Sequence, residues 1–179
     1  MSELAANSGN SPAVVASPEI AAAGQYLTFV LGGEVYALGI LNIKEIIDYG
    51  DLTEVPMMPA CVRGVINLRG SVVPVVDLFA RFGKGSSKIA KRTGIIIVET
   101  SAGDGDSANQ DIGIIVDAVN EVVDIDRRDI EPPPSFGTGI RPDFISGMAK
   151  RNGRFVILLN IDRVLSVDEM TRLSQAAAV

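Results

Sequence analysis

The chain has 179 residues, of which 47% are apolar and 21% are charged, and its formal net charge is −6. This size and composition are typical of a globular protein with a substantial core. The acidic balance argues against a nucleic-acid partner, because affinity for phosphate backbones depends largely on Lys and Arg. The sequence contains no histidine, which excludes Ser-His-Asp and Cys-His catalytic groups and imidazole metal ligands.

Residues 1–24 are rich in Ala, Ser, Asn and Pro and follow neither a helical nor an alternating period, so we expect a disordered tail. Glu3 and the interrupting polar residues are unlike a signal peptide. Apolar runs such as Ile95–Val98 are too short to span a bilayer, so we expect no membrane insertion. The single cysteine, Cys61, predicts a small buried side chain and a reducing, cytoplasmic compartment.

The first ordered segment expected is a β-hairpin over residues 25–40. Its two strands, QYLTFVL and EVYALGI, flank the Gly32-Gly33 turn. Further along, the spacing predicts a single helical turn, although the β-branched side chains also permit a strand; the residues are Ile40, Ile43, Ile46 and Ile47.

The stretch Gly64–Leu78, GVINLRGSVVPVVDL, is the most informative part of the chain. It begins with a glycine-bounded loop that carries Arg69 and continues into a strand over Val72–Val76. Pro74 favours an edge strand or a bulge, because proline has no N–H to donate to a ladder. Asp77 is a candidate N-cap for a short helix.

The second half of the chain repeats this plan. Without a gap, Tyr36–Asp48 aligns with Ile112–Asp124, and Gly64–Leu78 aligns with Gly147–Ile161. The aligned pairs include Ile43 with Val119, Glu45 with Glu121, Ile46 with Val122, Gly64 with Gly147, Gly70 with Gly153 and Asp77 with Asn160. Each half has about five strand-like segments with short helices, so the repeat predicts two small barrels related by an approximate two-fold axis. Their expected boundaries are about 25–83 and about 94–166.

The repeat also serves as an internal control. Features that both halves share are explained by the fold, whereas features of one half are free to serve a function. The partner of Arg69 is Asn152, and the partner of Asn67 is Lys150. An Arg in a glycine-bounded turn is ordinarily a solvated surface residue. The asymmetry between the halves adds the alternative that the polar hairpin tip around Arg69 has a functional role, and both interpretations stay open.

Two further segments complete the chain. Asp104–Gln110 is rich in oxygen side chains but lacks EF-hand spacing, so we expect a hairpin loop and no metal. The last residues, 167–179, are expected to form a C-terminal helix, with a capping box from Ser166 and Glu169 at its start.

Four blocks of the sequence, LTFVLGGEVYALGILNIKEI, PMMPACVRGVINLRGSVVPVVDL, IGIIVDAVNEVVDI and GMAKRNGRFVILLNIDRVL, resemble the CheW-type chemotaxis coupling proteins. The resemblance implies one domain over 25–166, made of two five-stranded SH3-like barrels, with no catalytic activity and no cofactor. It implies a cytoplasmic scaffold, monomeric when isolated, that couples the tips of transmembrane chemoreceptors to the regulatory domain of a histidine kinase.

The same resemblance implies which residues contact each partner. The receptor-binding groove between the barrels would include Ile43, Glu45, Gly64, Asn67, Arg69 and Val119. The kinase would contact another surface, for which the candidates are Val55, Met57 and Met58. Two alternatives stay open: a coupling protein of a parallel chemosensory pathway such as surface motility, and a barrel that binds a small ligand.

Overall fold

The computed structural model describes residues 24–100, 109–133, 139–166 and 169. The predicted tail, apart from residue 24, lies outside these residues. So do most of Asp104–Gln110 and of the C-terminal helix.

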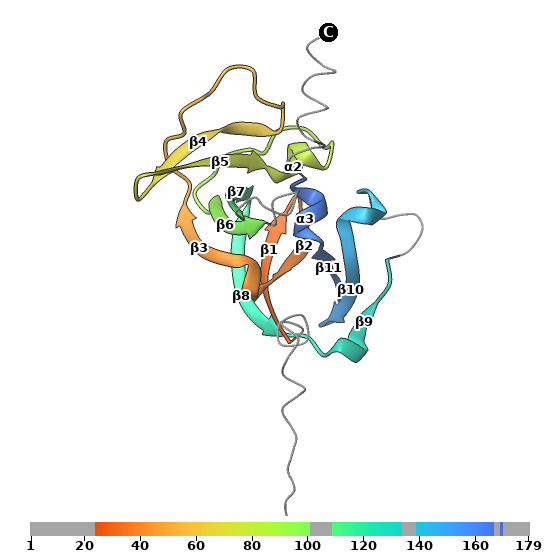
Figure 1. Ribbon diagram of the computed structural model, residues 1–179. Helices are drawn as coiled ribbons and strands as arrows, with labels where there is room; N and C mark the ends of the chain where they lie inside the picture. Colours follow the sequence, from red (N-terminus) through yellow and green to blue (C-terminus); the bar gives the residue numbers. More distant parts are fainter. Residues whose placement is uncertain (1–23, 101–108, 134–138, 167–168, 170–179) are drawn as a thin grey trace, which may run out of the picture.

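Eleven strands with short intervening helices make up the described chain (Figure 1). The strands are β1 (Gln25–Leu31), β2 (Glu34–Gly39), β3 (Ile43–Asp48), β4 (Val62–Leu68), β5 (Ser71–Asp77), β6 (Gly94–Thr100), β7 (Gln110–Val116), β8 (Ala118–Asp124), β9 (Ile130–Glu131), β10 (Ile145–Arg151) and β11 (Arg154–Leu159). The α-helices are α2 (Leu78–Arg81) and α3 (Ile161–Val164), and the 3-10 helices are η3 (Ile40–Asn42), η4 (Arg127–Asp129) and η5 (Pro142–Phe144). The predicted mainly β fold and the first hairpin are confirmed.

The strands form a six-stranded sheet, in the order β8-β1-β2-β11-β10-β9, and a five-stranded sheet, in the order β3-β6-β7-β5-β4. Each sheet takes strands from both halves of the sequence. Parallel pairing of β2 with β11 joins the halves in one sheet, and parallel pairing of β5 with β7 joins them in the other. The boundaries expected from the repeat therefore delimit segments of sequence and do not coincide with the two sheets.

The registers of these two parallel ladders confirm the internal repeat. Leu158 pairs with Ala37 in one ladder, and Val75 pairs with Gly113 in the other. In the sequence alignment Ala37 corresponds to Gly113, and Val75 corresponds to Leu158. The two junctions are thus the same contact with the halves exchanged, as an approximate two-fold axis requires.

The core consists of three apolar clusters. The largest takes side chains from both sheets and contains the ring contacts of Phe29 with Tyr36, Tyr36 with Phe82, and Phe82 with Phe144. Each sheet also has a smaller cluster of its own on its other face. This explains the unbroken apolar run Ile95–Val98, because a strand buried on both faces has no solvent-facing positions.

Two local predictions are modified by the structure. The segment Ile40–Ile47 is a single 3-10 turn followed directly by β3, so both alternatives hold for part of it. Pro74 does not lie on an edge strand, because β5 is internal. Val65, its partner on β4, directs its own N–H and C=O to Thr53 on the opposite side, and the ladder to β7 begins only at Val75. Proline is therefore tolerated where neither neighbouring strand needs its N–H.

Candidate functional site

The tip of the β4–β5 hairpin carries Arg69 in an unfavourable backbone conformation. Its φ is 52°, in the left-handed region, and Gly70 follows with a φ of 88°. The equivalent residues Asn152 and Gly153 have φ values of 51° and 79°, so both hairpins make the same turn. Asn tolerates this conformation far better than Arg, which is strained by about 1 kcal/mol or more. Strain that the sister hairpin avoids indicates that the Arg69 side chain serves another purpose.

Arg69 reaches across the five-stranded sheet to Glu45 on β3. Its Nη1 donates to Glu45 Oε1 at 2.6 Å and its Nη2 donates to Oε2 at 3.1 Å. This fork-to-fork pair raises the pKa of Arg69 above its ordinary value. The arginine side chain is 75% exposed and the glutamate side chain 24% exposed, so the guanidinium remains accessible from solvent.

The surroundings of this pair are polar. Asn67 Oδ1 accepts a hydrogen bond from the Gly70 N–H at 2.9 Å and supports the turn. Lys44 Nζ lies 3.3 Å from Asp111 Oδ2. Together with the Glu45–Arg69 pair, Lys44 and Asp111 border a surface depression of about 190 Å³. Glu121 corresponds to Glu45 in the second half of the chain. Within the described residues it makes no ion pair, so the two halves differ at this position.

An apolar surface runs along β3 and β8, each of which is one of the two edge strands of its sheet. Ile43 and Val119 are half-buried and pack against the largest core cluster. Ile46 and Val122 are 47% and 48% exposed. Ile46 pairs with core residue Ile96, and Val122 pairs with core residue Leu27. Because directly paired residues share a face, all four side chains lie along the margin of the largest cluster. We call Ile43, Ile46, Val119 and Val122 the edge stripe.

The two edges approach each other at Gly94, the first residue of β6. A methyl group at Gly94 would lie 3.5 Å from Val119 Cγ2 and 3.6 Å from the Ile47 carbonyl oxygen. The sequence prediction included Ile43 and Val119 and missed Ile46 and Val122. The repeat alignment carried part of the signal, since it pairs Ile46 with Val122 as it pairs Ile43 with Val119. The exposure of both side chains became visible only in the structure.

Gly64 is required by the packing of the backbone around it, which leaves no room for a side chain. A Cβ there would lie 2.5 Å from the carbonyl oxygen of Thr53, which bridges to β4 at Val65. Its counterpart Gly147 is similarly closed, since a Cβ would lie 2.5 Å from Ile130 Cγ2. In both halves a glycine lets an extra segment pack across the bulged hairpin strand.

We therefore expect Gly64→Ala to lower the free energy of unfolding by about 1–3 kcal/mol, because backbone atoms must shift to relieve the overlap. Urea denaturation measures this change. Gly70→Ala is the comparison that isolates crowding from conformation, since Gly70 also has positive φ but has open space around it. A smaller loss for Gly64→Ala than for Gly70→Ala would contradict the packing explanation.

The three residues suggested for kinase contact lie in the connection between β3 and β4. Val55 is 38% exposed, Met58 is 36% exposed, and Met57, with a φ of 66°, is 88% exposed. They form a separate group of exposed apolar side chains, away from the Glu45–Arg69 pair in sequence.

The structure also contains a pocket of about 410 Å³ between the β1–β2 turn, α2 and the loop before β6. Polar groups at its wall bond to the protein itself: Asp117 Oδ2 accepts from the Gly32 N–H, Thr93 Oγ1 accepts from the Ala90 N–H, and the Ser87 hydroxyl donates to Asp77. Because these polar groups already have hydrogen-bond partners within the protein, the pocket does not favour the alternative of a barrel that binds a small ligand. No cluster of three metal-ligating side chains occurs among the described residues. Cys61 is buried as predicted, and burial raises the pKa of its thiol.

A family model, the CheW-like domain, matches residues 25–169. The chain belongs to the CheW family. It is 30% identical to the chemotaxis protein CheW of Klebsiella aerogenes over 153 residues, which cover 86% of this chain and 88% of that protein. Its structure resembles that of the scaffolding protein TtCheW from Thermoanaerobacter tengcongensis, with a TM-score of 0.70 and 38% identity over 79% of this chain and 86% of the other. It is also 30% identical to protein FrzA of Myxococcus xanthus, over 69% of this chain and 74% of that protein.

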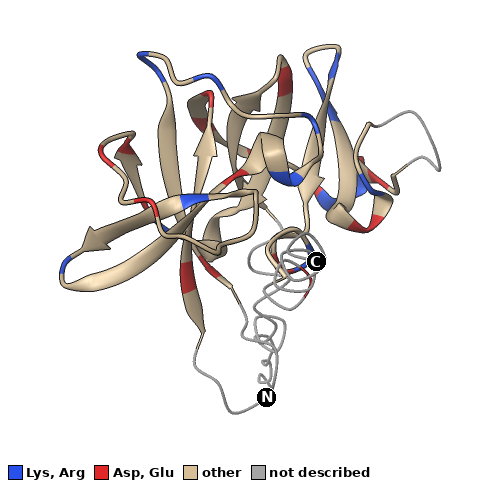
Figure 2. Cartoon of the chain, turned by 90° about the horizontal axis from the view of Figure 1, so that it is seen from above, with Lys and Arg blue, Asp and Glu red and all other residues tan. Residues whose placement is uncertain are grey.

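Membership of the CheW family confirms the resemblance seen in the sequence and the two-sheet fold. None of the helices in the described part of the chain is long and apolar enough to cross a bilayer. Figure 2 shows Lys and Arg interspersed with Asp and Glu around the molecule, without one side of a single sign.

Proposed function

We propose that this CheW-family protein is a non-enzymatic cytoplasmic scaffold that couples transmembrane chemoreceptors to a chemotaxis histidine kinase. It would be recruited to membrane-associated receptor arrays, where receptor state controls kinase activity. Family membership supports the class of function. The strained, solvent-accessible Arg69, which pairs with Glu45 on the same strand as Ile43 and Ile46, is the observation that supports a receptor site at this place.

The proposed receptor surface combines the edge stripe with the Glu45–Arg69 pair. Apolar side chains at the margin of a core supply contact area to a partner helix. A charged group at the rim contributes mainly to orientation and to the choice of partner. Ile43, Ile46, Val119 and Val122 have the first role, and Arg69 has the second. Asn67 shapes the hairpin tip that presents Arg69, and Gly64 holds the base of the same hairpin.

The proposed kinase surface is the exposed group Val55, Met57 and Met58. Methionine suits a surface that must adapt to a partner, because its side chain is flexible and polarizable. The place of Val55, Met57 and Met58 in a separate loop is compatible with a scaffold that holds the kinase and the receptor at the same time.

Arg69→Asn is expected to weaken binding to a receptor signalling fragment by about tenfold while preserving or slightly raising thermal stability. The variant copies Asn152, so the hairpin keeps its turn and loses the strain and the charge together. Isothermal titration calorimetry gives the affinity, and thermal unfolding gives the stability.

Asn152→Arg is the matched control, because it places the same side chain at the same backbone position of the other hairpin. It is expected to leave receptor affinity unchanged and to lower stability slightly. Full receptor binding by Arg69→Asn, or equal loss in both variants, would contradict the role assigned to Arg69.

The likeness to FrzA keeps the alternative of a parallel chemosensory pathway with the same mechanism and other receptors. Purification of the tagged protein from its own cells, followed by mass spectrometry of the bound receptors and kinase, distinguishes the two. Capture of chemoreceptors with the flagellar kinase supports chemotaxis, and capture of the other pathway's kinase supports the alternative.

A further inference from the structure

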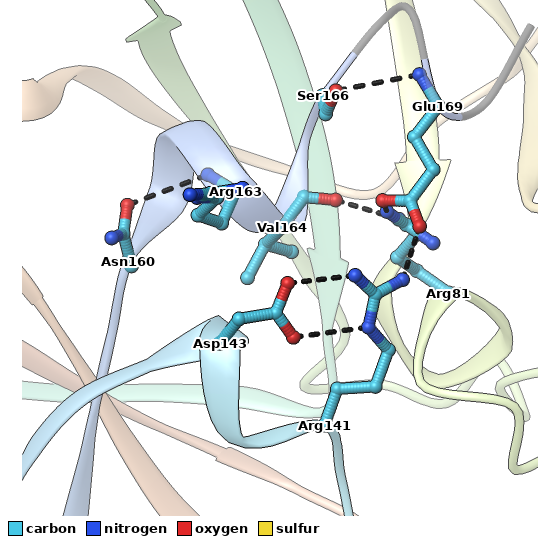
Figure 3. A network of polar contacts seen from close by, with 8 residues as sticks. All are labelled: Arg81, Arg141, Asp143, Asn160, Arg163, Val164, Ser166 and Glu169. Atoms are coloured by element: carbon cyan, nitrogen blue, oxygen red, sulfur yellow. Dashed lines mark hydrogen bonds and ion pairs between the residues drawn. The ribbon is translucent and has the colours of Figure 1, made fainter.

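A buried arginine lies near the end of the first half of the chain. The side chain of Arg81, the last residue of α2, is only 4% exposed. Its Nε donates to the Val164 carbonyl oxygen of α3 at 2.6 Å, and its Nη2 donates to Glu169 Oε1 at 2.7 Å (Figure 3). A buried guanidinium is costly unless a negative group neutralises it, and Glu169 is the carboxylate that does so here.

A second arginine reaches the same carboxylate. Arg141, just before η5, donates from Nη1 to Glu169 Oε2 and holds Asp143 through its Nε and Nη2 at 3.0 and 2.7 Å. The guanidinium carbons of Arg81 and Arg141 lie 4.8 and 4.5 Å from the centroid of the Phe144 ring. Two cations thus share one aromatic ring. They also share one carboxylate, and each binds a different carboxylate oxygen (Figure 3).

We propose that Arg81 and Arg141 form a carboxylate-binding site whose ligand within this chain is Glu169, and that this site fastens the C-terminal segment across the junction of the two sequence halves. The three residues come from segments far apart in the sequence: α2, the approach to η5, and the C-terminal segment. The site lies beside the Phe82–Phe144 contact, which also links the two halves.

The charge of Glu169 is the property that the site uses. The sequence assigns Glu169 to a capping box with Ser166, and its backbone N–H does donate to Ser166 Oγ at 3.3 Å. Its side chain, however, is directed to the two arginines instead of back to the Ser166 backbone N–H, as a capping box requires (Figure 3). Glutamine would keep the backbone cap and the length of the side chain but would leave Arg81 without a counter-charge.

The charged groups around Glu169 make the stability of this carboxylate-binding site depend on pH. Arg141 on the approach to η5 and Arg81 on α2 lower the pKa of Glu169 below its ordinary value. Asp143 faces the same Arg141 and its pKa is lowered too, with a smaller contribution from Arg163 of α3. A carboxyl group with a lowered folded-state pKa stabilises the fold above its unfolded pKa, and this contribution is lost as the pH falls through the folded value. The ion pairs of Glu169 with Arg81 and Arg141 are therefore intact at neutral pH and lost in acid.

The test is Glu169→Gln in the full-length chain, followed by hydrogen exchange of the α3 amides. The Val164 and Leu165 amides bond to the carbonyl oxygens of Asn160 and Ile161. At neutral pH we expect them to exchange about tenfold faster in the variant, because Arg81, whose Nε donates to the Val164 carbonyl oxygen of α3, loses its counter-charge. Glu54→Gln removes the same charge from an exposed position and is expected to leave these rates unchanged.

Arg141→Gln supplies the second arm, since Arg141 is half exposed and its replacement leaves the core intact. If both residues act through one site, the double variant with Glu169→Gln exchanges no faster than the faster single variant. The carbon-13 titration of the Glu169 carboxyl should shift to higher pH in Arg141→Gln. Rates for Glu169→Gln within twofold of the unaltered protein, or fully multiplicative effects in the double variant, would overturn the proposal.

Discussion

Replacing Asp77 with alanine is expected to lower the free energy of unfolding by about 3–5 kcal/mol, because the buried amide and hydroxyl of Ser87 and the partly buried Arg63 lose their acceptor. The Asp77 side chain is 1% exposed, and its carboxylate collects contacts from three parts of the chain. It accepts from the Phe79 and Ala80 amides at the start of α2. It also accepts from the amide and the hydroxyl of Ser87 and lies 3.4 Å from an Arg63 nitrogen.

The second half of the chain provides the control for this prediction. Asn160 caps α3 at the position equivalent to Asp77, by accepting from the Arg163 amide. Asn160→Ala should therefore cost only the capping contribution of about 1 kcal/mol. Urea denaturation of both variants separates the cap from the buried cluster around Ser87. Equal losses for Asp77→Ala and Asn160→Ala would show that the cluster contributes nothing beyond the cap.

The double variant Ile46→Glu with Val122→Glu is expected to lower affinity for a receptor signalling fragment at least about 30-fold, the effect of losing central apolar contacts of an interface. Both side chains are about half exposed, so the fold should tolerate the change. Binding is measured by calorimetry, with circular dichroism as the check on folding.

Ile89→Glu is the matched control, because Ile89 is 43% exposed and lies in the loop before β6 rather than on the edge stripe. It is expected to bind the fragment normally. Retention of affinity in the Ile46 and Val122 double variant would exclude the edge stripe as the receptor surface. An equal loss in the Ile89 variant would assign the effect to net charge alone.

The elements of this fold follow from local patterns in the sequence. Alternating apolar residues on either side of Gly32-Gly33 specify the first hairpin, and Asp77 and Asn160 each cap a short helix as predicted. These features depend on residues close together in the chain, so backbone geometry and side-chain chemistry decide them locally. The repeat was likewise visible in the sequence, because matching glycines and caps keep the same spacing in both halves.

The candidate site was only partly predictable. The comparison of Arg69 with Asn152 singled out the hairpin tip, and the structure adds the left-handed backbone and the pair with Glu45. Ile46 and Val122 were not selected, because exposure of an apolar residue on an edge strand depends on which strand lies beside it. Glu169 was assigned to a helix cap, because its partners Arg81 and Arg141 are distant in the sequence and no local pattern indicates that they contact it.

The sequence by itself determined the β-rich composition, the duplicated plan, the capped helices and the family. Only the tertiary structure decided that each sheet is built from both halves, that Pro74 lies on an internal strand, and that Arg81, Arg141 and Glu169 meet. The physical reason is the range of the interactions. Turns and caps are settled over three or four residues, whereas parallel pairing and buried ion pairs join residues separated by tens of positions, where only packing of the whole chain brings them together.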